Sequence, residues 1–330
     1  MSPVSGSSHV ATFDQSFWVR DVASTLQPSP TQRTTLIVAG VYIIVIAILW
    51  HVPILNKISE HRVISCWLIL LAQYTPSSEI IAGPLSQEAS HTSISRLLTV
   101  GFHEMSHAIM GLLTCAKIHS IELDPDEGGA TSMSGGIPWL TLPAGYLGSS
   151  FIGACLIACG FDTNASKVAV IVIGVFFLFT LWWARRNWLT WVLILSMAGL
   201  IILFWFVAES VALRFLVLFI GVMSCLYCIW DIIDDTIARK VNSSDASAFA
   251  KICGCCPSQV WGVIWLIQAF IFFIAGILVG LAAFKQSTAQ QKEDSSHFLP
   301  APGSTSAAFE LSPDVFLMTL FALLISALGL

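Results

Sequence analysis

The stretch Phe102-His103-Glu104-Met105-Ser106-His107-Ala108 lies inside an apolar run, residues 94–115, that is long enough to cross a bilayer as a helix. On a helix, residues four positions apart share a face, so both imidazoles can reach one metal ion. Glu104 points about 100° away around the helix, where it can act on a water molecule at that metal. The stretch therefore predicts a zinc site inside the membrane, with His103 and His107 as ligands and Glu104 as general base.

The same three side chains have a plainer interpretation. A polar patch could face neighbouring helices, with the imidazoles and the carboxylate hydrogen-bonded to backbone groups or to one another. Ionisable groups at the centre of a bilayer cost about 2.5–3.5 kcal/mol each on insertion scales, so a cluster of three needs a compensating partner. A metal ion would be such a partner, which favours the zinc interpretation.

The composition of the chain indicates a membrane protein. Hydrophobic residues make up 56% of the chain, charged residues only 11%, and the mean hydropathy is +0.80. The net charge of -5 is small and the basic residues are scattered, so we expect no nucleic-acid partner. We expect an integral, multi-pass protein of the lipid bilayer, in the endomembrane system (ER or Golgi) or the plasma membrane.

Apolar runs of helical length predict the fold class, an all-α polytopic membrane protein with a bundle of about seven transmembrane helices. The runs cover residues 35–53, 94–115, 140–160, 168–183, 188–207, 211–233 and 260–284. A further run, residues 63–72, is about half the length of a spanning helix and is expected to lie at the interface or against the bundle.

A small β-hairpin is expected directly after the motif helix. Residues 118–123 alternate between apolar and polar, turn residues follow, and a second strand rich in small residues runs to Gly136. A helical substrate must unwind before its backbone can be cut, and an edge of this hairpin could pair with the unwound segment.

The chain divides into four parts by composition. Residues 1–33 are a polar tail, residues 34–284 the membrane-embedded domain, residues 285–313 a polar linker and residues 314–330 an apolar segment. The tail does not resemble a cleavable signal peptide. The last segment is expected to be an extra membrane helix, and the tail of a glycolipid-anchor signal is the alternative.

Basic residues between the runs predict the orientation of the bundle. One path of the chain through the membrane places the hairpin and the N-terminus in the cytosol. This threading also places five basic residues there, namely Arg185, Arg186, Arg239, Lys240 and Lys251.

A zinc peptidase site needs a third protein ligand, and the run at residues 211–233 ends in acidic residues. Counted back from the basic residues that follow each helix, His107 and Asp231 both lie about 12–15 Å inside the cytosolic boundary. Asp231 is thus at the height of the ligands and is the favoured third ligand. Asp234 and Asp235 lie nearer the water, where they are either alternative ligands or the hydrated end of a helix.

The motif helix, the hairpin, the Gly-rich helix that follows and the late acidic residues together resemble the site-2 protease family of intramembrane zinc metallopeptidases. Residues 102–111, 143–150 and 226–235 are similar to a peptidase-like branch of that family found in plants, fungi and bacteria. The resemblance covers about residues 90–280. It implies Zn²⁺ bound by His103, His107 and an Asp, with Glu104 activating water to hydrolyse membrane-anchored protein substrates, as in regulated intramembrane proteolysis.

The chain departs from better-studied members on the helix expected to carry the third ligand. Those members have an Asn-Pro pair and an Asp-Gly pair there. In this chain Asp231 is followed by Ile232, and residues 211–233 contain no Pro. The choice between Asp231 and Asp234 or Asp235 therefore stays open.

Two other functions are compatible with the pattern. A catalytically silent relative could act as a membrane scaffold or chaperone, and intramembrane His and Asp also mark ion pathways in transporters. A scaffold has no need of Glu104 between two ligands, and a transporter would repeat its polar sites over several helices. The sequence therefore favours a zinc metalloendopeptidase.

The small residues of the third run have two interpretations. Gly145, Gly148 and Gly153 permit close approach of neighbouring helices, or they line a path for the substrate.

The cysteines are interpreted by their position. Cys225 and Cys228 lie within an apolar run and are expected to be buried thiols. Cys253, Cys255 and Cys256 form a cluster beside the membrane, where lipid modification of a thiol and the absence of any role are both open.

Overall fold

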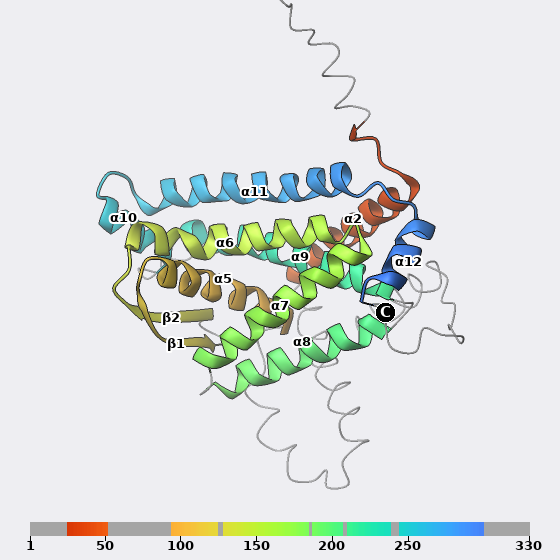
Figure 1. Cartoon of the computed structure of the whole chain (residues 1–330). Coiled ribbons are helices and arrows are strands. Elements are labelled where there is room, and N and C mark those ends of the chain that lie inside the picture. The colour runs from red at the N-terminus through yellow and green to blue at the C-terminus, as the bar shows by residue number, and fades with distance from the viewer. Residues whose placement is uncertain are drawn as a thin grey trace, which may run out of the picture.

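The computed structural model describes residues 25–51, 94–124, 128–184, 187–206, 210–238 and 244–299. Every run expected to span the membrane forms a helix (Figure 1). These helices are α2 (Pro30–His51), α5 (Ile94–Leu113), α6 (Pro138–Cys159), α7 (Thr163–Trp183), α8 (Trp188–Phe206), α9 (Val211–Ile233) and α11 (Ser258–Ala283). The run at residues 63–72 and the apolar segment 314–330 lie outside the described residues.

Five helices in the described part of the chain are long and apolar enough to cross a membrane, namely α2, α6, α7, α9 and α11. The apolar part of α8 is shorter, Thr190–Phe206, and α5 carries the polar motif and is not among the five. The chain is therefore a mostly helical, multi-pass membrane protein. The expected number of seven spanning helices is not confirmed.

Helix α6 is held between α9 and α11 by close glycine contacts. A Cβ on Gly221 of α9 would lie 2.9 Å from the carbonyl oxygen of Gly153, and one on Gly276 of α11 would lie 2.6 Å from that of Ala154. Larger side chains would force these backbones apart. Gly153 therefore serves helix packing, which is one of the two roles that the sequence left open.

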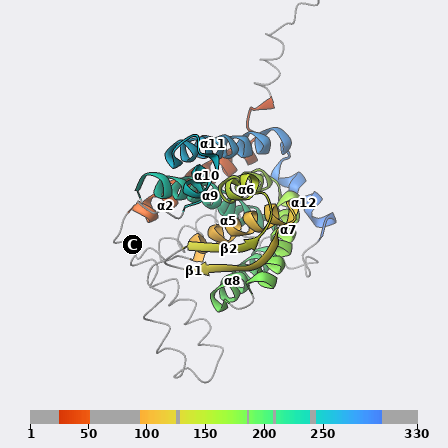
Figure 2. The ribbon, with the colours of Figure 1, turned by 90° about the vertical axis from the view of Figure 1, so that its left-hand side faces the viewer.

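The expected hairpin is present after α5. Strands β1 (Lys117–Asp124) and β2 (Gly128–Ser134) pair antiparallel, with an irregularity between Ile118 and Ser120. Figure 2 shows the hairpin alongside α5. The side-chain amide of Asn187 donates to the carbonyl of Leu123 at 2.7 Å, which ties β1 to the start of α8. The hairpin is thereby fixed against the helix that carries the motif.

The start of α2 lies beside the end of α11, at the other end of the bundle from the hairpin (Figure 1). The side-chain amide of Gln32 donates to the carbonyl oxygen of Phe284 at 2.6 Å, and the hydroxyls of Thr31 and Thr288 are 3.0 Å apart. The expected placement of the N-terminal end of this helix on the hairpin side is therefore wrong, whereas the cytosolic placement of the hairpin and of Lys251 stays a prediction. The physical reason is that Gln32 satisfies carbonyl groups that the end of α11 leaves without a helical partner.

Part of the expected polar linker is a helix, α12 (Thr288–His297), which begins with a capping box formed by Ser287 and Gln290. Gln291 donates to the carbonyl of Phe161 at 3.0 Å and accepts from the guanidinium of Arg214 at 2.7 Å. Helix α12 is thus docked on the end of the bundle opposite the hairpin.

Candidate metal centre

The two histidines of the motif meet on one face of α5. Their Nε2 atoms are 3.0 Å apart, and the two rings pack edge to face with centroids 4.7 Å apart. His107 is buried and His103 half-buried. The helical spacing of the motif therefore brings both nitrogens to one point, as the sequence predicts.

A third donor joins them from α10 (Asp245–Cys253), which begins next to the N-cap residue Ser244. The Oδ2 atom of Asp245 lies 3.0 Å from Nε2 of His103 and 3.0 Å from Nε2 of His107. Among the described residues, this trio is a group of His, Cys and carboxylate donors close enough to hold one metal ion.

Asp245 is the residue that the sequence analysis missed. A Ser at the N-cap followed by an acidic residue is a common helix start, and that signal was available. The signal does not show that the chain returns to α5 after α9, because that return depends on packing between distant segments. Burial by itself raises the pKa of Asp245, but the two histidines in their protonated form, His107 first, outweigh burial through their positive charge and hydrogen bonds and hold the pKa well below its usual range.

The backbone fixes which nitrogen of His107 faces the group. The Nδ1 atom of His107 lies 2.6 Å from the carbonyl oxygen of Thr141, which can only accept a hydrogen bond, so Nδ1 carries the proton. In the neutral ring, Nε2 then has a lone pair directed at His103 and Asp245. Metal-ligating histidines are commonly held in this way.

The donor set therefore fits a cation. A lone pair on Nε2 of His107, the Nε2 atom of His103 and an anionic oxygen of Asp245 converge within 3.0 Å, an arrangement that is repulsive unless positive charge lies among them. A proton on one imidazole can supply that charge, and so can a metal ion. Tetrahedral zinc with ligands at about 2.0–2.1 Å separates them by roughly 3.3 Å, close to the separations present here.

Gly145 of α6 keeps space open next to these donors. A Cβ at this position would collide with the Nε2 atoms of both His103 and His107. The Cβ of any other residue would occupy the place where the two lone pairs converge. Gly145 thus faces the candidate metal centre, whereas Gly153 in the same helix serves packing.

Asp231 lies near the group but on the other side of His103. Its Oδ2 atom is 4.0 Å from Nδ1 of His103, the ring nitrogen that faces away from the group. Asp235 accepts a hydrogen bond from the hydroxyl of Tyr146, whose ring packs edge to face on His103 at 4.7 Å. Asp234 is the first residue of the π-helical turn that follows α9. The structure therefore brings none of these three carboxylates into the group of converging donors.

Glu104 is held by the hairpin. Its side chain is buried, and its Oε2 atom accepts a hydrogen bond from the hydroxyl of Thr131 on β2 at 2.6 Å. A Cβ on Gly129 would lie 2.5 Å from Cγ of Glu104, so the strand passes directly over this side chain. The hairpin predicted from sequence thus has a specific neighbour, the carboxylate expected to act as the base.

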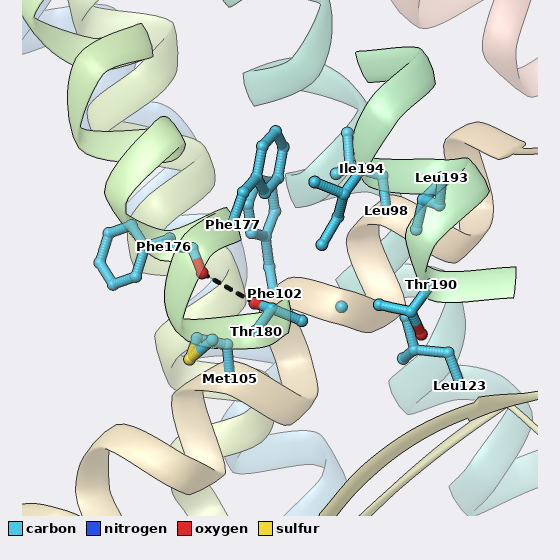
Figure 3. Close-up of a pocket in the computed structure, with 11 residues that line it drawn as sticks. Leu98, Phe102, Met105, Leu123, Phe176, Phe177, Thr180, Thr190, Leu193 and Ile194 are labelled. Atoms are coloured by element: carbon cyan, nitrogen blue, oxygen red, sulfur yellow. Dashed lines mark hydrogen bonds between the residues drawn. The ribbon is translucent and has the colours of Figure 1, made fainter. Parts of the chain in front are cut away.

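A pocket lies beside α5, between this helix, α7 and α8 (Figure 3). It is lined by apolar side chains of α5, α7 and α8, among them Phe102, Met105 and Phe177, and by Leu123 of β1. On a helix, positions 98, 102 and 105 share a face that is roughly opposite to the face of positions 103 and 107. The pocket is therefore separate from the candidate metal centre.

The family model described as Peptidase M50B-like matches residues 63–276, a range that contains His103, Glu104, His107 and Asp245. No curated protein and no solved structure matches the chain. The match covers more than half of the chain and agrees with the resemblance to site-2 proteases, and it suggests an intramembrane metallopeptidase. The chain therefore belongs to the Peptidase M50B-like family.

Proposed function

We propose that this protein is an intramembrane zinc endopeptidase that hydrolyses peptide bonds of membrane-anchored proteins. The observation that carries the proposal is the convergence of His103 Nε2, His107 Nε2 and Asp245 Oδ2 at mutual distances of 3.0 Å, on the same helix as the buried Glu104. Three protein ligands and a nearby carboxylate are the composition of a catalytic zinc site, in which one coordination position stays open.

The residues divide the chemistry among them. Zinc, when bound, supplies a Lewis acid that polarises the scissile carbonyl and lowers the pKa of water to about 7. Glu104 accepts the proton from the attacking water and returns it to the leaving amine nitrogen. Thr131 holds the carboxylate of Glu104 in place, since its hydroxyl lies 2.6 Å from Oε2. Gly145 leaves the space in which a scissile peptide group can approach the histidines.

The hairpin offers a means of presenting the substrate. A transmembrane substrate helix must unwind locally, and its freed backbone groups then need new partners. A segment that pairs along β2 would pass Thr131 and thus lie beside Glu104. The partner is accordingly a membrane-anchored protein in the lipid bilayer, and the location in endomembranes or the plasma membrane remains a prediction from sequence.

Asp245 is proposed as the third ligand in preference to Asp231. The oxygen of Asp245 faces the Nε2 atoms of both histidines at 3.0 Å, whereas Asp231 faces Nδ1 of His103 at 4.0 Å. A carboxylate behind a ligating imidazole commonly orients the ring rather than binding the metal. The alternative is that Asp231 is the third ligand. Zinc affinities of the Asp231→Asn and Asp245→Asn variants decide between the two.

The test separates metal binding from hydrolysis. Elemental analysis of monodisperse, detergent-purified wild type is expected to give about one zinc per chain, lost in His103→Ala and His107→Ala. Glu104→Gln is expected to keep the zinc. In cells, truncated forms of membrane-anchored proteins should accumulate with wild type and disappear with Glu104→Gln.

Two results would overturn the proposal. Well-folded wild type without zinc would exclude a zinc enzyme and favour the scaffold or chaperone. Zinc binding with the same truncated proteins in wild type and Glu104→Gln would place this chain among catalytically silent relatives.

A further inference from the structure

A cluster of three thiols forms the corner between α10 and α11. Cys253 is the last residue of α10, Cys255 and Cys256 follow, and α11 begins at Ser258. All three are free cysteines; Cys255 is exposed, and Cys253 and Cys256 are half-buried. None of them belongs to the group of donors around His103, so the cluster has no part in the chemistry described above.

The corner lies at the start of α11, where the chain enters the membrane. Helix α11 is long and apolar enough to span a membrane, and Val260 in its first turn is 41% exposed. Its outward face continues with Val263, Ile264 and Ile267, which are 46–56% exposed. On the other side of the corner, Ile252 is 44% exposed. Apolar side chains that a soluble protein would bury thus flank the thiols on both sides, as expected at a lipid boundary.

The backbone presents Cys255 outward. Gly254 ends α10 in the left-handed conformation, with φ +65°, and Pro257 precedes the first turn of α11. The chain therefore turns sharply between two helices, which leaves Cys255 at the tip. A β-branched or bulky residue in place of Gly254 would be strained in this conformation.

The two sulfur atoms nearest the tip are in contact. The Sγ atoms of Cys253 and Cys255 are 3.0 Å apart. The hydrogen bond with Cys255 raises the pKa of Cys253, and either thiol can be the donor in this contact. Of the two residues, Cys255 is the more exposed, so its thiol is the more accessible to a reagent at the membrane surface.

We propose that Cys255 is an S-acylation site, which takes a long-chain fatty acyl group from acyl-coenzyme A. The sulfur of Cys255 attacks the thioester carbonyl, a new carbon–sulfur bond forms, and the bond to the coenzyme A sulfur breaks. Coenzyme A leaves as a thiolate and takes up the proton that Cys255 lost. The acyl chain then inserts into the bilayer next to the outward face of α11.

The basic residues of the segment between α9 and α11 are consistent with acyl-coenzyme A as the acyl donor. Lys251 is exposed two residues before Cys253, and the same segment contains Arg239 and Lys240. An excess of Lys and Arg in short loops marks the cytosolic side, where acyl-coenzyme A is available. The same charges attract the anionic lipids of that leaflet.

Serine variants of the cluster should fold, because α10 is held by other residues. Ala246 and Phe249 are buried, and the Phe249 ring packs edge to face on Trp261 and Trp265 with centroids 4.7 and 5.5 Å apart. Cys253 packs at the edge of this hydrophobic cluster, whereas Cys255 is exposed and is not part of it. If a serine variant carries no acyl group, the reason is therefore the missing thiol and not a misfolded protein.

The experiment is a hydroxylamine-dependent mass-tag assay on the full chain, expressed in a eukaryotic host and extracted with N-ethylmaleimide to block free thiols. Wild type is expected to carry a tag that requires hydroxylamine. Cys255→Ser should lower the tagged fraction about fivefold or more, and Cys253→Ser should retain it. Cys115→Ser and Cys155→Ser, which remove exposed thiols elsewhere, serve as matched controls and should retain it.

A wild-type protein without a hydroxylamine-dependent tag would overturn the proposal. A tag that persists in Cys255→Ser would overturn the assignment to this residue. A modification released by reductant alone would instead show a disulfide between Cys253 and Cys255. Because the assay reads neither zinc nor hydrolysis, its outcome is independent of the function proposed above.

Discussion

The hydroxyl group of Thr131 lies 2.6 Å from a carboxylate oxygen of Glu104 and joins the β-hairpin to the residue proposed as general base. Glu104 is 5% exposed, so few waters can replace this bond. A hydrogen bond to a charged group contributes about 1.5–3 kcal/mol. The hairpin thus restricts the orientation of the base, and this contact can be removed without touching a metal donor.

We expect Thr131→Val to lower the rate of hydrolysis about tenfold, because a misoriented carboxylate is a poorer base. Zinc content should be unchanged. The measurement is turnover of a substrate identified by the comparison of wild type with Glu104→Gln, alongside elemental analysis. Thr131→Ser, which keeps the hydroxyl, is the control and should be nearly as active as wild type. Equal activity of the Val and Ser variants would remove Thr131 from the mechanism.

Gly145 provides a second test, aimed at the space beside the histidines. A Cβ at this position would collide with both Nε2 atoms, so Gly145→Ala should abolish zinc binding while the helix itself remains favourable. Gly174→Ala is the matched control, since a Cβ there meets nothing within 4 Å. Elemental analysis of both monodisperse variants gives the answer. Zinc retained in Gly145→Ala would show that the metal does not lie where these nitrogens converge.

The two candidate carboxylates should behave differently. Asp245→Asn is expected to abolish zinc binding, because it removes the negative oxygen that lies 3.0 Å from both histidines. Asp231→Asn should still bind zinc but about 10–100-fold more weakly, as for a residue that orients a ligand. Competition with a chromophoric chelator measures both affinities. The reverse order would restore Asp231, the choice made from sequence, as the third ligand.

The sequence predicts local features of this protein well. The spacing of His103 and His107 determines that their nitrogens converge, because four residues make about one helical turn. The alternation at residues 118–123 and the glycines that follow determine the hairpin in the same local way. Each of these depends on neighbours in the chain, and the structure confirms that they form.

The parts that the sequence did not predict depend on distant segments. Asp245 reaches the histidines because the chain turns back after α9. The hydrophobic pattern of the sequence does not predict this long-range contact. Depth along a helix places Asp231 at the height of the histidines, and in the structure its carboxylate lies 4.0 Å from Nδ1 of His103. The docking of Gln32 on the end of α11 is similarly non-local. Hydrophobic length identifies helices, whereas contacts between polar groups decide how their ends are arranged.

The docking of α12 can be tested through Lys167. Its ammonium group is almost completely buried and donates to the carbonyls of Ser295 and Phe298 at 2.8 Å each, at the C-terminal end of α12. Lys167→Ala leaves these carbonyls without that donor and should lower the free energy of unfolding by about 1–3 kcal/mol. Thermal unfolding in detergent measures the loss, and Lys251→Ala, which removes an exposed lysine, is the control. Zinc content should be the same in both variants, since α12 lies at the opposite end of the bundle from α10, the helix that carries Asp245 (Figure 1). An unchanged midpoint for Lys167→Ala would show that the contact between Lys167 and α12 does not stabilise the fold.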